Sequence, residues 1–232
     1  MQVRTKRNIH VGINFIVAPL PSFDKSNVLR FQSQLEIEKI ETTNVTYTPN
    51  QISIFRQSPN ASLEIRLMNV GPQVSQIIIL FSNPDYSMEV IEEEIDRILR
   101  VFNNVWPTAN KQLISSDSTI RTLYDSTSQH AFQELWENRL NQRTEDLSIF
   151  GRPIHGGGIR FVLPPLNQTD PNDPLIEIKI ESFLPDPRKI YVEAQFVWKN
   201  PVLLTSNITG IEKVQTVDKY INETIVNFIG VN

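Results

Sequence analysis

Apolar and polar side chains alternate along several segments of this chain, most regularly over residues 175–183 and 189–199. In the first of these, isoleucines occupy positions 176, 178 and 180, and charged residues occupy the positions between them. A period of two residues places the two kinds of side chain on opposite faces of a strand, which is typical of an antiparallel sheet with one buried face. Alternation or continuous apolar runs predict further strands over residues 11–18, 28–40, 51–57, 63–70, 74–82 and 159–163.

Other stretches have apolar residues at helical spacing. The clearest covers residues 88–103, where apolar positions recur three and four apart and acidic side chains gather near the start. Acidic residues at the beginning of a helix and basic residues at its end complement the helix dipole, which supports this interpretation. The sequence predicts a second helix over residues 211–228 and a bridging helical segment over residues 115–143, which a polar patch breaks or bends.

These elements predict an α+β fold, with a mainly antiparallel sheet of about seven to eight strands and three or four helices packed against it. The 232 residues are interpreted as a single domain, 1–232. A strand-rich first part, 1–107, ends in the helix 88–103. A strand-rich second part, 157–232, ends in the helix 211–228.

The two parts show a possible internal duplication. A shift of 113 positions places residues 63–79 on residues 176–192 without a gap, with four identities. Both copies continue to an Asn-Pro pair and then to an amphipathic helix. A repeated hairpin-plus-helix unit could pair with its copy around one core. Two alternating strands joined by a turn also resemble each other by chance, so both interpretations stay open.

Composition narrows the functional classes. The chain has no cysteine, which excludes disulfides, thiolate metal sites and a cysteine nucleophile. The net charge is −4 with both signs interspersed, so a clustered basic face for nucleic acid is not expected. No apolar run approaches the ~20 residues of a membrane span. The basic residues before segment 11–18 resemble the start of a signal peptide, but the alternation favours a strand, and we expect a cytoplasmic protein without membrane or nucleic-acid partners.

One glycine-rich segment is a candidate ligand site. His155 and the three glycines after it resemble the oxyanion-hole loop of lipases, but the Gly-x-Ser-x-Gly elbow that such a loop serves is absent. Backbone amides with nearby guanidinium groups could instead bind a small anion, and the alternative is a loop that leads into the strand 159–163. The candidate ligand-binding residues are Arg152, His155, Gly156, Gly157, Gly158 and Arg160.

No other group of residues indicates chemistry. His130 and Glu134 lie four residues apart on the bridging segment and share a helical face, but two ligands without a third are weak evidence for a metal. The acidic run 92–94 is explained by its place near the start of a helix. We therefore predict no catalytic residue, no metal and no cofactor.

The leading hypothesis is a non-enzymatic protein that acts by protein–protein interaction or self-association, because catalytic motifs are lacking and the alternating segment 28–40 offers an edge for association. The alternative is a small anionic-ligand-binding protein or enzyme that uses the loop 152–160, with His155 as acid or base and the arginines holding the anion.

Overall fold

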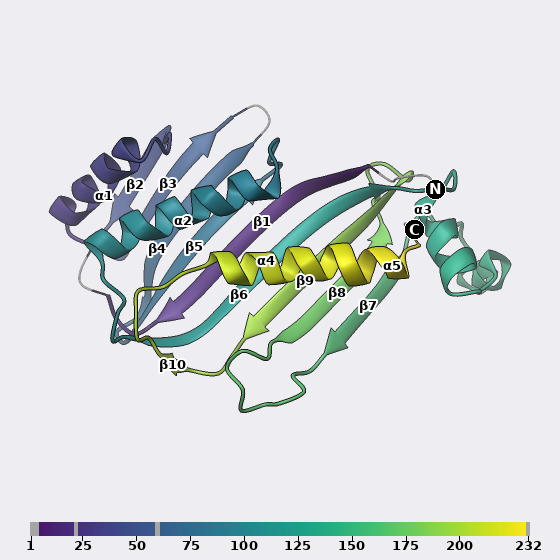
Figure 1. Ribbon diagram of the computed structural model, residues 1–232. Helices are drawn as coiled ribbons and strands as arrows, with labels where there is room; N and C mark the ends of the chain where they lie inside the picture. Colours follow the sequence, from purple (N-terminus) through teal and green to yellow (C-terminus); the bar gives the residue numbers. More distant parts are fainter. Residues whose placement is uncertain (1–4, 21–22, 59–60, 231–232) are drawn as a thin grey trace.

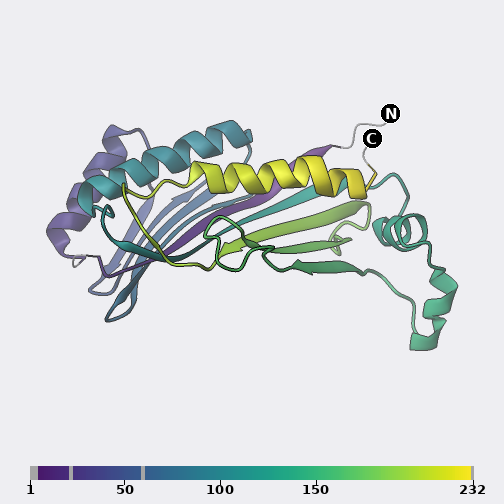
Figure 2. The same cartoon turned by 60° about the horizontal axis from the view of Figure 1, so that its bottom comes forward.

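The computed structural model describes residues 5–20, 23–58 and 61–230, which form a ten-stranded antiparallel sheet with long helices on one face (Figures 1 and 2). The strand order is β2-β3-β4-β5-β1-β6-β9-β8-β7, and the short β10 pairs with β6. The strands are β1 (Lys6–Val17), β2 (Asn44–Thr48), β3 (Gln51–Gln57), β4 (Ser62–Gly71), β5 (Val74–Ser82), β6 (Gln112–Asp125), β7 (Gly158–Leu163), β8 (Leu175–Ser182), β9 (Lys189–Trp198) and β10 (Val202–Leu203).

The helices fall into an N-terminal pair, a short cluster between β6 and β7, and a C-terminal rod that continues through a π-helical turn. They are α1 (Lys25–Ile37), α2 (Met88–Val105), α3 (Ala131–Gln133), the π-helix η1 (Glu134–Arg139), the 3-10 helix η2 (Thr144–Phe150), α4 (Ile211–Tyr220), the π-helix η3 (Ile221–Ile225) and α5 (Val226–Phe228). The predicted helices 88–103 and 211–228 correspond to α2 and to the rod α4–η3–α5.

The prediction of an α+β fold with a mainly antiparallel sheet is confirmed, but the numbers of elements differ. The described residues form ten strands, where the sequence predicts about seven to eight. Strands β2, β6 and β10 escape the alternation pattern, and residues 28–40 are not a strand. Five α-helices are present in the described part of the chain, two of them only three residues long.

The prediction of a strand over residues 28–40 is wrong, because residues 28–37 belong to α1 and none of the last three is in a strand. The helix begins after Asp24, whose side chain accepts a hydrogen bond from a backbone N–H three residues later, at 2.8 Å, as a helix N-cap does. Its buried residues are Val28, Phe31 and Leu35, spaced three and four apart. Leu29 and Ile37, which the strand interpretation places on the buried face, are exposed. The exposed edge expected there does not exist.

The prediction of helix over residues 115–143 is wrong in its first part, which is the central strand β6. Within that range, α3 and η1 are helical. Ser118 and Thr122 on the buried face of β6 donate hydrogen bonds to oxygen atoms of β1 at 3.2 and 2.9 Å. Buried hydroxyl groups with partners are tolerated in a core, and they hide the apolar alternation that reveals the other strands.

The core lies between the sheet and the two long helices. Helix α2 presents Ile91, Ile95 and Ile98, each at most 1% exposed, and α4 presents Val214 and Val217, which are fully buried. Each such side chain contributes ~1.5–3 kcal/mol when it is fully removed from water. The described helices do not include one long and apolar enough to cross a membrane.

Strands β1 and β6 pair at the centre of the sheet, and a hairpin flanks each of them. The hairpin β4–β5 lies beside β1 and is followed by α2, and the hairpin β8–β9 lies beside β6 and is followed by α4. These are the hairpins that the sequence places over residues 63–79 and 176–192. Figure 1 shows α2 and α4 side by side over them, with opposite chain directions. The two parts therefore place a hairpin and a helix at matching positions.

The register of the two hairpins differs by two residues. In the first hairpin Ile65 lies opposite Ile79. The gapless shift of 113 would place Ile178 opposite Val192, but its partner is Ala194. Along β4 and β8 alone the shift aligns the buried Ile65 and Leu67 with the buried Ile178 and Ile180, so it still defines which residues of these two strands are equivalent.

Candidate functional site

The predicted glycine-rich loop connects η2 to β7. Arg152 and His155 are exposed, and Arg152 lines a cavity of about 630 Å³ between α3 and η2. Arg160 lies on β7, where its Nη2 atom is 2.5 Å from Oε2 of Glu177. This arginine would have to leave Glu177 to hold an anion. The convergence of Arg152, His155 and Arg160 on one ligand therefore stays a prediction.

The three glycines are explained by close packing. A Cβ atom on Gly158 would overlap the carbonyl oxygen of Ile180 on the neighbouring strand β8. A Cβ atom on Gly157 would lie 2.9 Å from the ring of Phe132. At least these two glycines are needed for the chain to enter β7 against its neighbours, which is the structural alternative to an anion site.

The side chains of His130 and Glu134 form hydrogen bonds with neighbouring residues of the chain and not with each other. The Nδ1 atom of His130 accepts a hydrogen bond from the backbone N–H of Phe132 at 3.2 Å, at the start of α3. The buried carboxylate of Glu134 accepts hydrogen bonds from the Ser126 hydroxyl at 2.6 Å and from the Thr127 backbone at 2.8 Å. Over the described residues, the structure has no group of three or more histidine, aspartate or glutamate side chains placed to hold a metal.

A charged cluster lies on the sheet face opposite the long helices. Glu193 of β9 contacts Arg121 at 2.6 Å, Lys179, and the Tyr191 hydroxyl at 2.8 Å. Burial acts to raise the pKa of Glu193, but these hydrogen bonds outweigh it and hold the pKa below its usual value. Burial and the Arg121 charge lower the pKa of nearby His10 to about 4. Each charged group of the cluster has a partner within it, so it is best explained as a structural network across four strands.

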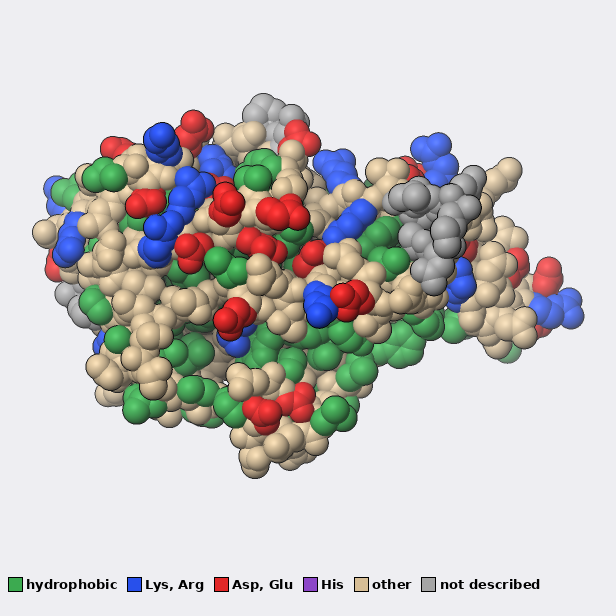
Figure 3. All heavy atoms as spheres, in the orientation of Figure 1, with side chains coloured by type: hydrophobic (Ala, Val, Ile, Leu, Met, Phe, Trp, Pro, Cys, Tyr) green, Lys and Arg blue, Asp and Glu red, His purple; other side chains and the backbone are tan. Residues whose placement is uncertain are grey.

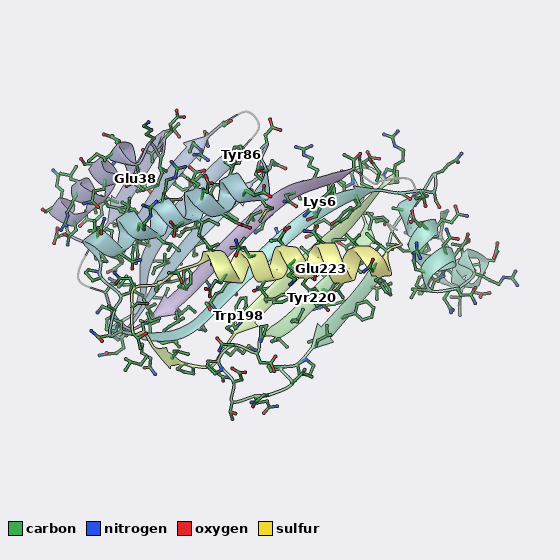
Figure 4. The ribbon with its side chains drawn as sticks, viewed as in Figure 1. Lys6, Glu38, Tyr86, Trp198, Tyr220 and Glu223 are labelled. Carbon is green, nitrogen blue, oxygen red and sulfur yellow. The ribbon has the colours of Figure 1, made fainter. Side chains whose placement is uncertain are left out.

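An apolar groove lies between the rod α4–η3–α5 and the strands β7 and β8, with a volume of about 270 Å³. We call it the α4–β7 groove. Its walls include Phe161, Leu163, Ile178, Tyr220, Ile225 and Phe228. Figure 3 shows hydrophobic side chains gathered below α4 on this face, and Figure 4 shows Tyr220 on the side of α4 that borders the groove. The sequence analysis did not identify this surface.

The matching place in the first part of the chain is covered. Ile54 of β3 lies opposite Ile65 of β4, and Phe161 of β7 lies opposite Ile178 of β8. Ile65 and Ile178 are related by the shift of 113, so Ile54 and Phe161 are equivalent. Ile54 is 1% exposed and Phe161 is 38% exposed. The same side of the sheet is therefore buried at β3 and open at β7.

In the first part, α1 packs against α2 and strand β2 extends the sheet beyond β3. Phe31 of α1 packs its ring 5.3 Å from Trp106 at the end of α2, and Nη1 of Arg97 donates to the backbone oxygen of Glu38 at 2.9 Å. Strand β2 pairs along the outer edge of β3. In the second part, the segment between β6 and β7 forms α3, η1 and η2, which extend beyond the end of the sheet (Figures 1 and 2). Strand β7 ends the strand order, so its outer edge has no pairing strand among the described residues, and its face is only partly covered.

Comparisons with known proteins add no further guide: no protein-family model matches the chain, and no curated protein matches it.

Proposed function

We propose that this chain is a cytoplasmic, non-enzymatic protein that binds an amphipathic helical segment of a protein in the α4–β7 groove. The observation that carries the proposal is the contrast between Ile54 and Phe161, equivalent residues of which the first is 1% exposed and the second is 38% exposed. Helix α1, which packs against α2 in the first part, is the chain's own model for such a segment. Laying the apolar face of a helix in a groove is a common mode of protein recognition.

The exposed apolar surface sets the scale of the interaction. Phe161 and Leu163 are each 38% exposed, and Phe228 is 40% exposed. Burying the remaining surface of these three side chains would contribute roughly 2–3 kcal/mol, from ~1.5–3 kcal/mol for a whole side chain. A micromolar complex requires about 8 kcal/mol. The ligand must therefore make further contacts, for which the unpaired edge of β7 supplies backbone N–H and C=O groups.

A labelled peptide with the sequence of residues 23–40 tests this proposal, because it carries the helix that occupies the equivalent place. Titration of the full chain, followed by fluorescence anisotropy, should show saturable binding. Phe161→Ser should weaken it at least tenfold, whereas Leu166→Ser, at a fully exposed leucine beyond β7, should not. A peptide with Phe31→Ser should bind more weakly than the original. Equal binding to the Phe161→Ser and Leu166→Ser variants would refute the proposal.

We also propose a second function, anionic-ligand binding by the loop 152–160, which rests on the cavity that Arg152 lines together with His130. Its volume of about 630 Å³ falls within the ~300–1,000 Å³ of small-molecule sites. Isothermal titration with inorganic phosphate should give measurable heat that Arg152→Ala removes and that Arg143→Ala, at an exposed arginine on the same segment, leaves unchanged. Absence of heat with the unmodified chain rejects this alternative.

A further inference from the structure

The 3-10 helix η2 has no buried residue. Ile149 is 84% exposed and Phe150 is 67% exposed, so two large apolar side chains at its end face water. Short 3-10 segments have poor hydrogen-bond geometry and gain little stability by themselves. Exposed apolar side chains gathered in one projecting element are typical of a surface that another molecule covers.

The segment that carries η2 is fixed at its base and turns sharply at both ends. Arg139 of η1 packs against Gly230, and Glu134 is held by hydrogen bonds to the residues after β6. Between this base and β7, the backbone enters the left-handed region at Asn141, with φ of 51°, and at Gly151, with φ of 67°. Figures 1 and 2 show η2 beyond the end of the sheet, away from the chain's own α4–β7 groove.

We infer that η2 of one copy of this chain packs into the α4–β7 groove of a second copy, and that the exchange is reciprocal in a two-fold dimer. The inference rests on the proposed function and names the partner of the same groove. Its basis is that the two complementary apolar surfaces are exposed on one chain. In the first part, the connection between β1 and β3 covers its own sheet with α1; in the second, the corresponding connection carries its apolar residues outward.

The groove is small. The groove, at about 270 Å³, is smaller than the ~300–1,000 Å³ of typical small-molecule sites and suits a few side chains. The end of η2 offers two, Ile149 and Phe150. A two-fold arrangement uses each surface twice and leaves no apolar end exposed, whereas a head-to-tail contact that does not close would continue into a filament.

Light scattering coupled to size-exclusion chromatography tests the dimer. The unmodified chain should elute as a dimer. An η2 variant with Ile149→Ser and Phe150→Ser and a groove variant with Phe161→Ser should each be monomers. An equimolar mixture of the two should recover heterodimer, because one arm and one groove remain intact, with weaker association than the original. Leu166→Ser should remain dimeric. Circular dichroism confirms that each variant is folded.

Cysteine cross-linking locates the contact, since the chain contains no cysteine of its own. Chains with Phe150→Cys mixed with chains with Thr224→Cys should form a disulfide-linked heterodimer under mild oxidation. A chain that carries both substitutions and cross-links within the monomer would show that η2 covers its own groove, which overturns the inference. The control places the second cysteine at the far end of the rod, with Lys213→Cys instead of Thr224→Cys. This pair should give at least tenfold less heterodimer.

The outcomes separate this inference from the proposed function. A chain that is monomeric at its highest soluble concentration, a dimer that neither variant disrupts, or an open polymer would each overturn the reciprocal dimer. If the η2 variant nevertheless binds the peptide of residues 23–40, the groove still recognises helices and the proposed function stands. If the dimer forms as inferred but the peptide fails to bind this variant, the general helix-binding function is the part that fails.

Discussion

The ion pair between Arg56 of β3 and Glu94 of α2 gives the sharpest test of how the first part is held together. Nη1 of Arg56 lies 2.5 Å from Oε1 of Glu94, Nη2 lies 3.1 Å from Oε2, and Nη2 also contacts the Tyr86 hydroxyl at 2.6 Å. Burial acts to lower the pKa of Arg56, but the hydrogen bond and charge of Glu94 reverse this and raise it above its ordinary value. The side chains of Arg56 and Glu94 are 14% and 6% exposed, so each charge has little contact with water and is stabilised by the other.

Removing one partner should therefore cost far more than removing both. Glu94→Leu and Arg56→Met should each lower the free energy of unfolding by about 3–5 kcal/mol, because each leaves a buried charge without its counterion. The double variant should lose much less than the sum, with a coupling energy of at least about 2 kcal/mol. Asp96→Asn on the same helix is the control: its partner Arg100 is 59% exposed, and such i,i+4 pairs contribute about 0.3–0.5 kcal/mol.

Urea unfolding of the original chain and the four variants, followed by circular dichroism and extrapolated linearly to zero denaturant, measures these differences. The slopes must agree among the variants for the comparison to hold. Additive losses in the double variant would refute the argument, as would single variants within about 0.5 kcal/mol of the original chain, since either would mean that water or another group already stabilises the two charges.

Three further predictions follow from the corrected elements. Phe31→Ala should destabilise the chain by about 3–5 kcal/mol, and Leu29→Ala by less than about 0.5 kcal/mol, in thermal or urea unfolding; equal effects would contradict the helical face of α1. Gly158→Ala should disturb β7 because its Cβ overlaps Ile180, whereas Gly71→Ala meets no atom within 4 Å; hydrogen exchange of β7 amides distinguishes them. His10 has a pKa of about 4 in the folded chain and 6.5 as its ordinary value, so the unfolded chain binds more protons between these values and stability falls as pH drops from 7 to 4. His10→Gln should show a smaller loss over that range, and an unchanged pH profile would exclude the contribution of His10.

The sequence predicts the parts of the fold in which one face is buried and the other is wet. The hairpins β4–β5 and β8–β9 and the helix α2 follow from simple periodicity. Helix α1 does not, because Phe31 and Leu35 fit both periods and the exposed Leu29 and Ile37 complete a false strand face. Strand β6 is missed for the opposite reason, since its buried face carries hydroxyl groups such as Ser118, which bond to β1 and remove the apolar signal.

The α4–β7 groove could not be predicted from the sequence. It is open only because η2 extends beyond the end of the sheet and does not cover β7. Nothing in residues 131–150 indicates that η2 projects while α1 folds back. The glycine-rich loop was the feature that sequence reasoning selected, and close packing of Gly158 against β8 accounts for it without a ligand. Glycine marks a close approach of two backbones as well as a binding loop, and sequence does not distinguish the two.

The residue types on the open face of β7 favour the proposal that another molecule covers this face. A strand whose face remains in water carries polar residues there at every second position. The face of β7 that borders the groove instead carries Ile159, Phe161 and Leu163, of which Phe161 already packs edge-to-face against Phe228 at 5.7 Å. At the equivalent of Leu163, the covered strand β3 has Arg56, whose charge is met by Glu94 from α2. The covered strand β3 thus has a polar residue at the position where the open strand β7 has an apolar one. Exposure to water would favour the opposite arrangement. A protein partner bound in the groove would explain the arrangement that is present.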